Sequence, residues 1–518
     1  MKFVRFVVKF LTVRPSHGAT RPVGVTNLAH NRPIQLQLKG SRIMFVVRLL
    51  TICCALLLAL PSLGAAADPP SRPNIVYILA DDLGSHDVGW RGSEIKTPNL
   101  DRLANSGARL NQFYVQPVCT PTRAALMTGR HPFRYGLQVG VIRPWAEYGL
   151  PLEERLLPQA LKEAGYQTAI TGKWHLGHFQ PDYLPTRRGF DHQYGHYNGA
   201  LDYFTHVREG GFDWHRDDKV SHDEGYSTEL IGREACRLIK ERDASKPLFL
   251  YVPFNGVHAP LQVPKKYAEP YAKFEGNRRT YAGMVTALDE AVGKIIAALD
   301  EAKLRENTLI LFSSDNGGPN PRTLTSNGPL RAGKGTLYEG GVRVCAFAAW
   351  EGQIKPGVIE TPIHMTDWYP TLLKLAGAKA EQPLPVDGHD VWAALNGGAS
   401  TRDTFVLNVT PNSGAIRVGD WKLVVNGGAV AGEDEEATPA AAAQPKRKKK
   451  AQRSQESVEL FNLAEDSAEQ HNVASQHAEK VKELRARLAA YSAQAAPAKS
   501  TPKAAGFVAP KVWGDFSN

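Results

Sequence analysis

The sequence predicts an α/β fold: a large mixed, mostly parallel sheet flanked by helices, followed by a small antiparallel sheet with one helix. The first observation is alternation, because short apolar, β-branched segments at residues 74–80, 247–254 and 308–313 are separated by segments with helical signals. The second is a change near Phe405, after which short strand-like segments are joined by glycine turns.

The elements of the large sheet follow from local patterns. Residues 74–80 (NIVYILA) form a short apolar run that ends in two aspartates, which suits a buried parallel strand. Residues 98–107 begin with a proline and end with a glycine, which predicts a helix. A second helix is expected at 281–302, between the strands at 247–254 and 308–313. Ligand sites in such sheets lie beyond the carboxyl ends of strands, so residues that follow a strand are the first candidates for a site.

The C-terminal part has a different organisation. Strands are expected at 415–418, 421–426 and 458–462, and a helix at 478–491. Residues 428–457 are rich in Ala and Pro and carry opposed charge blocks, a composition that predicts a disordered loop. We therefore divide the chain into a large domain at 72–400 and a C-terminal subdomain at 401–518.

Residues 1–67 have the features of a targeting region. Arg48 precedes an apolar run at 49–60, and three alanines at 65–67 resemble a cleavage site, so a signal peptide is expected at about 44–67. The apolar run is shorter than the roughly 20 residues of a membrane-spanning helix, which argues against a stable membrane anchor. Residues 1–43 are interpreted as an over-extended gene start. A periplasmic or secreted protein is expected.

The net charge of +10 does not indicate a nucleic-acid partner. Residues 1–67 hold nine Lys and Arg and no Asp or Glu, so the rest of the chain is close to neutral. Once the leader is set aside, the cysteines are Cys119, Cys236 and Cys345. Their number is odd, so at least one is unpaired, and their spacing matches no zinc motif.

Two segments carry residues suited to chemistry. Residues 119–123 (CTPTR) place Cys119 before an expected helix, where it could be an ordinary buried thiol or a thiolate stabilised by the helix and Arg123. Residues 172–177 (GKWHLG) offer Lys173 as a point charge for an anion and His175 as a group that moves protons. Taken alone, such a Lys-x-His segment is more often part of an ordinary surface.

Oxygen donors follow two of the predicted strands. Asp81 and Asp82 end the first strand, and Asp315 and Asn316 follow the strand at 308–313. Oxygen-only ligation indicates a hard cation, calcium or magnesium, before zinc. Taken alone, the Asp pair is better explained as two solvated acids at a strand end. His258 by itself could be a structural histidine, and Lys334 a loop charge; these two residues complete the candidate set.

These motifs together resemble the signatures of the sulfatase family. The segment 119–123, followed by Leu-Met-Thr-Gly-Arg at 126–130, is similar to the first sulfatase signature, and 172–177 is similar to the second. The likeness extends over about 73–392 and looks like the arylsulfatase B (N-acetylgalactosamine-4-sulfatase) branch. Ser85-His86 departs from the expected Trp-Asn, and the disulfide cysteines of the animal enzymes are missing.

The resemblance implies an alkaline phosphatase-like fold and a sulfuric ester hydrolase. It implies one calcium ion per chain and conversion of Cys119 to 3-oxoalanine (formylglycine) by a maturation enzyme. A hydroxyl of the hydrated aldehyde would attack sulfur, and the second would allow sulfate to be released. The implied metal ligands are Asp81, Asp82, Cys119, Asp315 and Asn316. Arg123, Lys173 and Lys334 would bind the sulfate, while His258, assisted by Lys334, would protonate the leaving oxygen and His175 would remove a proton to expel sulfate.

The expected substrate is a sulfated carbohydrate or an aryl sulfate. The resemblance points to N-acetylgalactosamine-4-sulfate glycans, and a related polysaccharide from algae or mucus suits the same chemistry. One alternative is a phosphate or phosphonate monoester hydrolase of the same superfamily. A catalytically dead carbohydrate-binding protein is a second, but such a protein would be expected to lack one of the catalytic or metal residues, and none is lacking.

Overall fold

The computed structural model describes residues 72–321, 323–428 and 456–516 of the 518-residue chain. The predicted targeting region at 1–67 lies outside the described residues, and so does nearly all of the loop predicted at 428–457. None of the described helices combines the length and the apolar character needed to cross a membrane.

The large sheet has ten strands, in the order β14-β2-β13-β11-β1-β10-β4-β5-β8-β9. Its five central strands, from β11 to β5, are parallel, and antiparallel pairs occur toward both edges, so the predicted mixed, mostly parallel sheet is confirmed. The central strands are β1 (Asn74–Ala80), β4 (Gln167–Lys173), β5 (His192–His196), β10 (Leu248–Pro253) and β11 (Thr308–Ser314). The outer strands are β2 (Ala108–Leu110), β8 (His215–Arg216), β9 (Lys219–Val220), β13 (Ala346–Ala349) and β14 (Gly357–Ile359).

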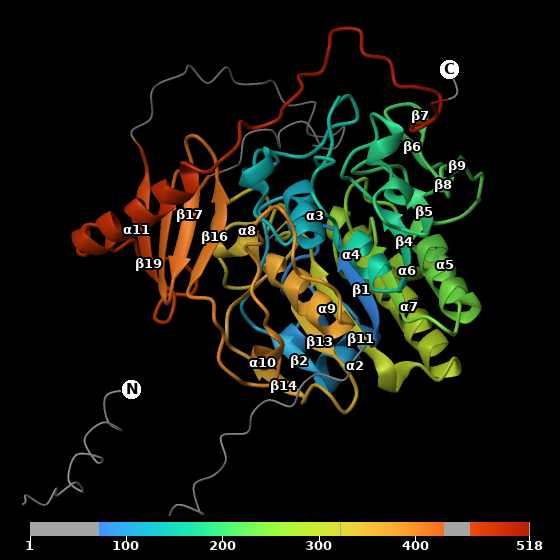
Figure 1. The fold of residues 1–518 in the computed structure, drawn as a ribbon, viewed down its shortest axis with the longest axis horizontal. Coiled ribbons are helices and arrows are strands. Elements are labelled where there is room, and N and C mark those ends of the chain that lie inside the picture. The colour runs from blue at the N-terminus through green and yellow to red at the C-terminus, as the bar shows by residue number, and fades with distance from the viewer. Residues whose placement is uncertain (1–71, 322, 429–455, 517–518) are drawn as a thin grey trace, which may run out of the picture. The chain divides into compact units, whose positions relative to one another are not determined.

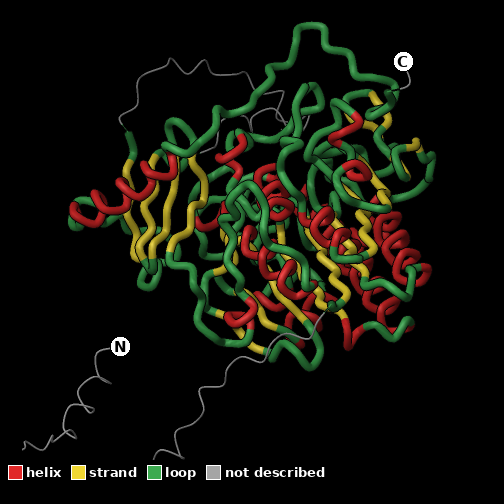
Figure 2. Tube along the Cα trace, viewed as in Figure 1, coloured by secondary structure: helices red, strands yellow, loops and turns green. Residues whose placement is uncertain are grey.

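Helices cover both faces of this sheet (Figures 1 and 2). Strand β1 contributes side chains to both hydrophobic cores, because successive side chains point to opposite faces of the sheet. Ile75, Tyr77 and Leu79 pack into the core with helices α3, α4 and α9, while Val76 and Ile78 pack into the core with α2, α5 and α7. The helices of the first core are α3 (Cys119–Thr128), α4 (Leu157–Glu163) and α9 (Trp368–Ala376), and those of the second are α2 (Pro98–Ser106), α5 (Ser227–Glu241) and α7 (Gly276–Glu301).

Helix α2 begins where the sequence predicts, and a partner helix completes its N-terminus. Pro98 occupies the first turn, where its missing N–H leaves no hydrogen bond unmade. The Asp289 carboxylate, on α7, accepts hydrogen bonds from the backbone N–H of Asn99 at 3.2 Å and of Leu100 at 2.8 Å. A side chain distant in sequence therefore satisfies backbone donors of this helix.

Short elements complete the large domain. A three-stranded sheet has the order β12-β3-β15, and β6 and β7 form a separate pair. These strands are β3 (Phe113–Tyr114), β6 (Val207–Arg208), β7 (Gly211–Phe212), β12 (Arg343–Val344) and β15 (Ile363–His364); the short helices are α6 (Lys265–Ala268), α8 (Glu339–Val342) and α10 (Trp392–Leu395), with 3-10 turns at Gly89–Arg91, Pro132–Tyr135, Pro181–Tyr183, Pro185–Arg187, Glu269–Tyr271, Arg305–Asn307 and Met365–Asp367.

The C-terminal sheet is antiparallel, with four strands in sequence order. One face packs with Tyr114, Leu337 and Val342 of the preceding domain. The other face packs against helix α11, through Leu484 and Leu488. The elements are β16 (Thr404–Val409), β17 (Gly414–Val418), β18 (Trp421–Val425), β19 (Val458–Asn462) and α11 (Ala478–Ser492).

A fully buried ion cluster joins this sheet to the large domain. The Lys422 ammonium, on β18, lies 2.8 Å from a carboxylate oxygen of Glu339 and 2.8 Å from one of Glu469. Glu339 opens α8, only a few residues after Lys334, and its second oxygen accepts a hydrogen bond from the Tyr114 hydroxyl at 2.8 Å. The cluster therefore connects the C-terminal sheet to the segment that carries a predicted site residue.

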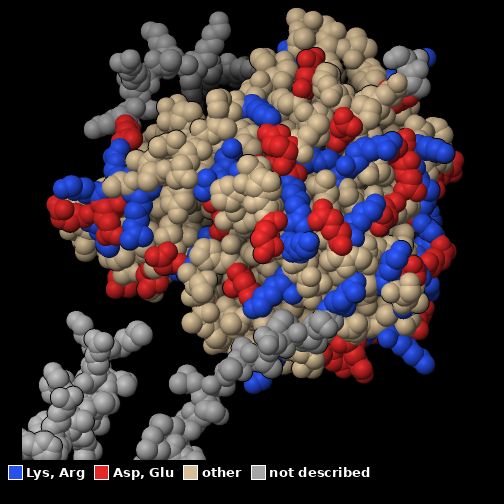
Figure 3. All heavy atoms as spheres, in the orientation of Figure 1, with Lys and Arg blue, Asp and Glu red and all other residues tan. Residues whose placement is uncertain are grey.

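Acidic and basic side chains are interspersed over the face of the molecule drawn in Figure 3. This distribution agrees with the near-neutral charge of the chain after residue 67.

Candidate active site

The oxygen donors predicted at two strand ends lie side by side. Strands β1 and β11 are parallel neighbours, and Ala80 pairs with Ser314, so the residues that follow them emerge at one edge of the sheet. The backbone N–H of Asp82 donates to Asp315 Oδ1 at 3.2 Å, and Asn316 Nδ2 donates to Asp82 Oδ1 at 2.7 Å. Asp82 has a φ of 60°, a left-handed conformation that turns the chain at the strand end.

Cys119 is the first residue of α3, and its side chain is fully buried beside Asp81. Its Sγ donates to Asp81 Oδ1 at 3.4 Å. Burial and the nearby Asp315 carboxylate raise the pKa of the Cys119 thiol well above its ordinary value, although Lys173 and Lys334 oppose the shift. In the absence of a bound cation, burial and Asp315 thus favour the neutral thiol of an unmodified Cys119 over the thiolate.

Arg123 lies one helical turn after Cys119 and is also fully buried. Its Nε and Nη2 donate to Asp315 Oδ2 at 3.1 and 2.8 Å, and its Nη1 donates to the Lys173 carbonyl oxygen at 3.1 Å. Burial by itself lowers the pKa of the guanidinium, but Asp315 and Asp81 outweigh it and raise the pKa above its ordinary value. Arg123 thus carries a permanent positive charge within this site.

Lys173 is the last residue of β4, and its side chain is fully buried. Its Nζ lies 2.6 Å from Asp81 Oδ2. The interpretation of this segment as ordinary surface is therefore wrong.

His258 and Lys334 both lie beside the Asp82 carboxylate, with His258 Nε2 3.6 Å from Asp82 Oδ2. Lys334 Nζ donates to Asp82 Oδ2 at 3.0 Å and lies 3.3 Å from His258 Nε2. His258 Nδ1 donates to the carbonyl oxygen of Ala259 at 2.6 Å, because a carbonyl can only accept. In the neutral ring Nε2 is therefore the acceptor for the Lys334 ammonium.

His175 is held in a left-handed backbone conformation, with a φ of 57°. Its Nε2 donates to the Ile142 carbonyl oxygen at 2.9 Å, and its own carbonyl accepts from the Thr120 hydroxyl at 3.1 Å. Gly199 packs so closely on the imidazole that a Cβ there would collide with the ring. These contacts fix the imidazole beside the start of α3.

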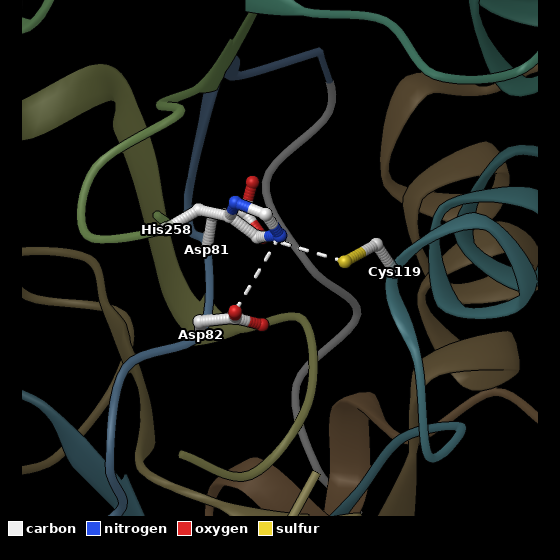
Figure 4. Close-up of side chains that lie close together, drawn as sticks. All are labelled: Asp81, Asp82, Cys119 and His258. Carbon is white, nitrogen blue, oxygen red and sulfur yellow. Dashed lines mark hydrogen bonds and ion pairs between the residues drawn. The ribbon is translucent and has the colours of Figure 1, made fainter. Parts of the chain in front are cut away.

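Four side chains bring potential metal ligands together, as Figure 4 shows. One ligand atom each from Asp81, Asp82, Cys119 and His258 lies within 4.8 Å of the others. Of the other two predicted ligands, Asp315 is hydrogen-bonded to Asp82. The buried Asn316 Oδ1 accepts no hydrogen bond from any described residue. An unsatisfied buried oxygen beside two carboxylates fits a hard cation, so the donor set is suited to the predicted metal.

Two contacts of the site were not identified from the sequence. The Thr120 hydroxyl receives a hydrogen bond from the Ile142 N–H at 3.1 Å and so links the start of α3 to the loop that holds His175. Thr120 is inside the Cys119 motif, which could have drawn attention to it. Nothing distinguishes Ile142 in the sequence, because its contribution is a backbone carbonyl.

With this geometry established, comparison with known proteins assigns the family. The family model described as "Sulfatase" matches residues 73–378. The chain belongs to the sulfatase family, whose members hydrolyse sulfuric esters, and the predicted family is confirmed.

Several relatives match most of the chain. Arylsulfatase J of Mus musculus is 38% identical over 476 residues, which cover 86% of this chain and 79% of the relative. N-acetylgalactosamine-6-sulfatase of Canis lupus familiaris is 35% identical, covering 71% of this chain and 74% of the relative. Among solved structures, Ps i-CgsB in complex with k-i-k-neocarrahexaose is 32% identical with a TM-score of 0.72, covering 82% of this chain and 94% of that chain. The arylsulfatase B branch stays a prediction.

Proposed function

We propose that this protein hydrolyses sulfate esters of sugars, using formylglycine formed from Cys119 and one calcium ion. The observation that carries the proposal is that a thiol, two carboxylates and two ammonium groups meet in one buried site. They come from the residues that follow β1, from α3, from β4 and from the loop that carries Lys334. Burying two carboxylates beside a third one is unfavourable unless cations accompany them, and Lys173, Lys334 and Arg123 supply part of that charge.

Calcium would be held by oxygen atoms of Asp81, Asp82, Asp315 and Asn316, together with the modified residue 119. The support is the donor set, which is rich in oxygen, and the buried Asn316 Oδ1 that accepts no hydrogen bond from the described residues. A bound divalent cation polarises a sulfate oxygen and favours an ionised nucleophile. Hydrated formylglycine would supply two hydroxyl groups. One would attack sulfur, and loss of the proton from the other would re-form the aldehyde and release sulfate.

The remaining residues act on the sulfate and on protons. Lys173 and Lys334 are within hydrogen-bond distance of the carboxylates, where they can also bind oxygens of an anionic ester. His258 accepts a hydrogen bond from Lys334 at Nε2, and the pair can deliver a proton to the departing sugar oxygen. His175 carries its proton on Nε2, so that its Nδ1 is the atom that can remove a proton during sulfate release.

The substrate class follows from the relatives. One is named for the 6-sulfate of N-acetylgalactosamine, and one solved structure of similar fold contains a neocarrahexaose. We therefore propose a sulfated sugar in a polysaccharide or glycosaminoglycan, and the 4-sulfate of N-acetylgalactosamine stays a prediction. A panel of sulfated oligosaccharides that differ only in sulfate position would identify the ester that is cleaved.

The phosphate or phosphonate monoester alternative is tested with one leaving group. The sulfate and phosphate esters of the same phenol are compared by kcat/KM on protein whose position 119 has been mapped by peptide mass. The proposal requires a preference for the sulfate ester. A preference for the phosphate ester would favour the alternative function.

We further propose that the protein is periplasmic or secreted and that a formylglycine-generating enzyme matures it. The buried position of Cys119 supports maturation before folding is complete, because the folded chain encloses the thiol.

A further inference from the structure

After helix α11 the chain continues as residues 494–516, here called the strap, which contains neither helix nor strand. Figure 1 shows it in red, leaving α11 and reaching the β6–β7 pair on the other side of the picture. It is nevertheless held in both its first and its second half by hydrogen bonds to the large domain.

The first half of the strap holds the loop that follows helix α3. The Lys499 N–H donates to the Gly136 carbonyl oxygen at 2.8 Å, and the Tyr148 hydroxyl donates to the Lys499 carbonyl oxygen at 3.3 Å. The Trp145 indole Nε1 donates to the Thr501 carbonyl oxygen at 2.8 Å. The strap thus contacts this loop on both sides of Ile142.

The second half is anchored by Trp513, whose side chain is 4% exposed. Its backbone N–H donates to the Phe212 carbonyl oxygen and its indole Nε1 to the Arg208 carbonyl oxygen, both at 2.9 Å. The indole also packs edge-on against His178, with ring centroids 5.3 Å apart. His178 lies three residues after His175 and donates from Nε2 to the Pro144 carbonyl oxygen at 3.1 Å.

The first half therefore contacts the loop on both sides of the short segment 142–144, and the second half reaches this segment through His178. This segment holds His175 through the Ile142 carbonyl and holds His178 through the Pro144 carbonyl. Its N–H at Ile142 is bound to Thr120, next to Cys119. Any shift of the segment would move the acceptor of His175 Nε2, and with it the orientation of the imidazole and the choice of the nitrogen that carries the proton.

We propose that the strap positions His175, with Trp145 and Trp513 as positioning residues that act through segment 142–144. The role of His175 in catalysis rests on the proposed function, whereas the effect of the strap on the segment does not. The two can therefore be tested separately.

The test uses the full chain with Trp145→Phe and Trp513→Phe combined. Each change keeps an aromatic ring and removes one indole donor, to Thr501 and to Arg208 respectively. The matched control is Trp421→Phe, a partly buried tryptophan of β18 whose indole N–H donates to none of the described residues. Val508→Ala is a control within the strap itself, because Val508 is 84% exposed.

Two readouts are measured on each variant. Hydrogen exchange should become faster in residues 138–149 and 172–178 of the double variant and remain unchanged in both controls. On a sulfate ester, kcat should fall about tenfold while KM stays within about twofold, because a misplaced proton-transfer group slows the chemistry without weakening substrate binding.

Several outcomes would overturn the proposal. Unchanged exchange in both segments would show that the strap does not hold segment 142–144. Faster exchange with an unchanged kcat would show that the strap holds the segment without positioning His175 for the reaction. A rise in KM alone would assign the strap to substrate contact. If the wild-type protein cleaves no sulfate ester, the proposed function fails, and the exchange experiment still decides whether the strap holds the segment.

Discussion

Arg123 and Asp315 form a fully buried ion pair in which Nε and Nη2 of the guanidinium both bind Oδ2 of the carboxylate, at 3.1 and 2.8 Å. This arrangement leaves Oδ1 facing the Asp82 backbone and the other donors of the metal site. Asp315 thus joins the helix of Cys119 to the proposed metal ligands, and its removal should affect both stability and metal binding.

The first prediction concerns Asp315→Ala. This change removes a proposed calcium ligand and leaves Arg123 buried without its closest carboxylate, so we expect substoichiometric calcium and a loss of about 3–5 kcal/mol in unfolding free energy. Metal analysis and denaturant unfolding check the two effects. Asn316→Ala should weaken calcium binding with a smaller loss of stability, because it breaks no ion pair. Full calcium occupancy in the Asp315→Ala protein would disprove the ligand assignment.

The second prediction concerns the state of residue 119. Active protein should carry an aldehyde at this position, detected by hydrazine-type labelling and peptide mass, and activity should follow the modified fraction. Cys119→Ser should not turn over, because a serine sulfate has no second hydroxyl on the same carbon whose deprotonation could release sulfate. Cys236→Ser is the control, since Cys236 is only partly buried and lies on α5, and its activity should match wild type. Full activity from protein with wholly unmodified Cys119 would exclude the mechanism.

The third prediction concerns pH and the buried cluster of Lys422. Burial and the facing Glu339 carboxylate raise the pKa of Glu469 from an ordinary 4.5 to about 7, although Lys422 opposes the shift. The folded protein therefore holds this proton more tightly than the unfolded chain. The resulting stabilisation is complete below pH 4.5 and is lost as the pH rises through about 7.

Glu469→Gln removes this titration, so its Tm should rise relative to wild type between about pH 5 and pH 8. Glu465→Gln, an exposed change in the same segment, should leave the pH profile of Tm unaltered. Parallel Tm curves for wild type and Glu469→Gln across this range would contradict the shifted pKa.

The fourth prediction tests the packing of helix α11 on the C-terminal sheet. Leu484 is fully buried against this sheet, so Leu484→Ala should destabilise the protein by about 2–5 kcal/mol. Lys482→Ala, on the exposed side of the same helix, is the control and should change stability little. Equal unfolding midpoints for the two variants would show that the helix contributes little to the fold.

Much of the site could be predicted because its residues follow strong local signals. Asp81 and Asp315 each end an apolar strand, and parallel neighbours place their carboxyl ends together. Strand β4, which ends in Lys173, has no clear signal in the sequence, because its segment (QTAITGK) has too short an apolar run. Helix α7 begins at Gly276 instead of near Tyr281, because residues 276–280 are polar and carry no apolar periodicity.

The contacts that could not be predicted are made by backbone atoms across long sequence separations. The Ile142 carbonyl orients His175, and the Thr501 carbonyl binds Trp145. Every residue type carries such a backbone carbonyl, so neither contact leaves a mark in the sequence. Side-chain patterns report burial and chemistry, but they do not report which carbonyl faces which donor. Such contacts become visible only in the folded chain.

The pairing of Ala80 with Ser314 means that the register of the sheet sets the spacing of the carboxylates proposed as metal ligands. One extra residue in either strand would displace the following ligands by about 3.3 Å and turn the strand's side chains to the opposite face. The two halves of the proposed metal site would then no longer meet. Insertions within β1 or β11 should therefore abolish activity even where the chain still folds.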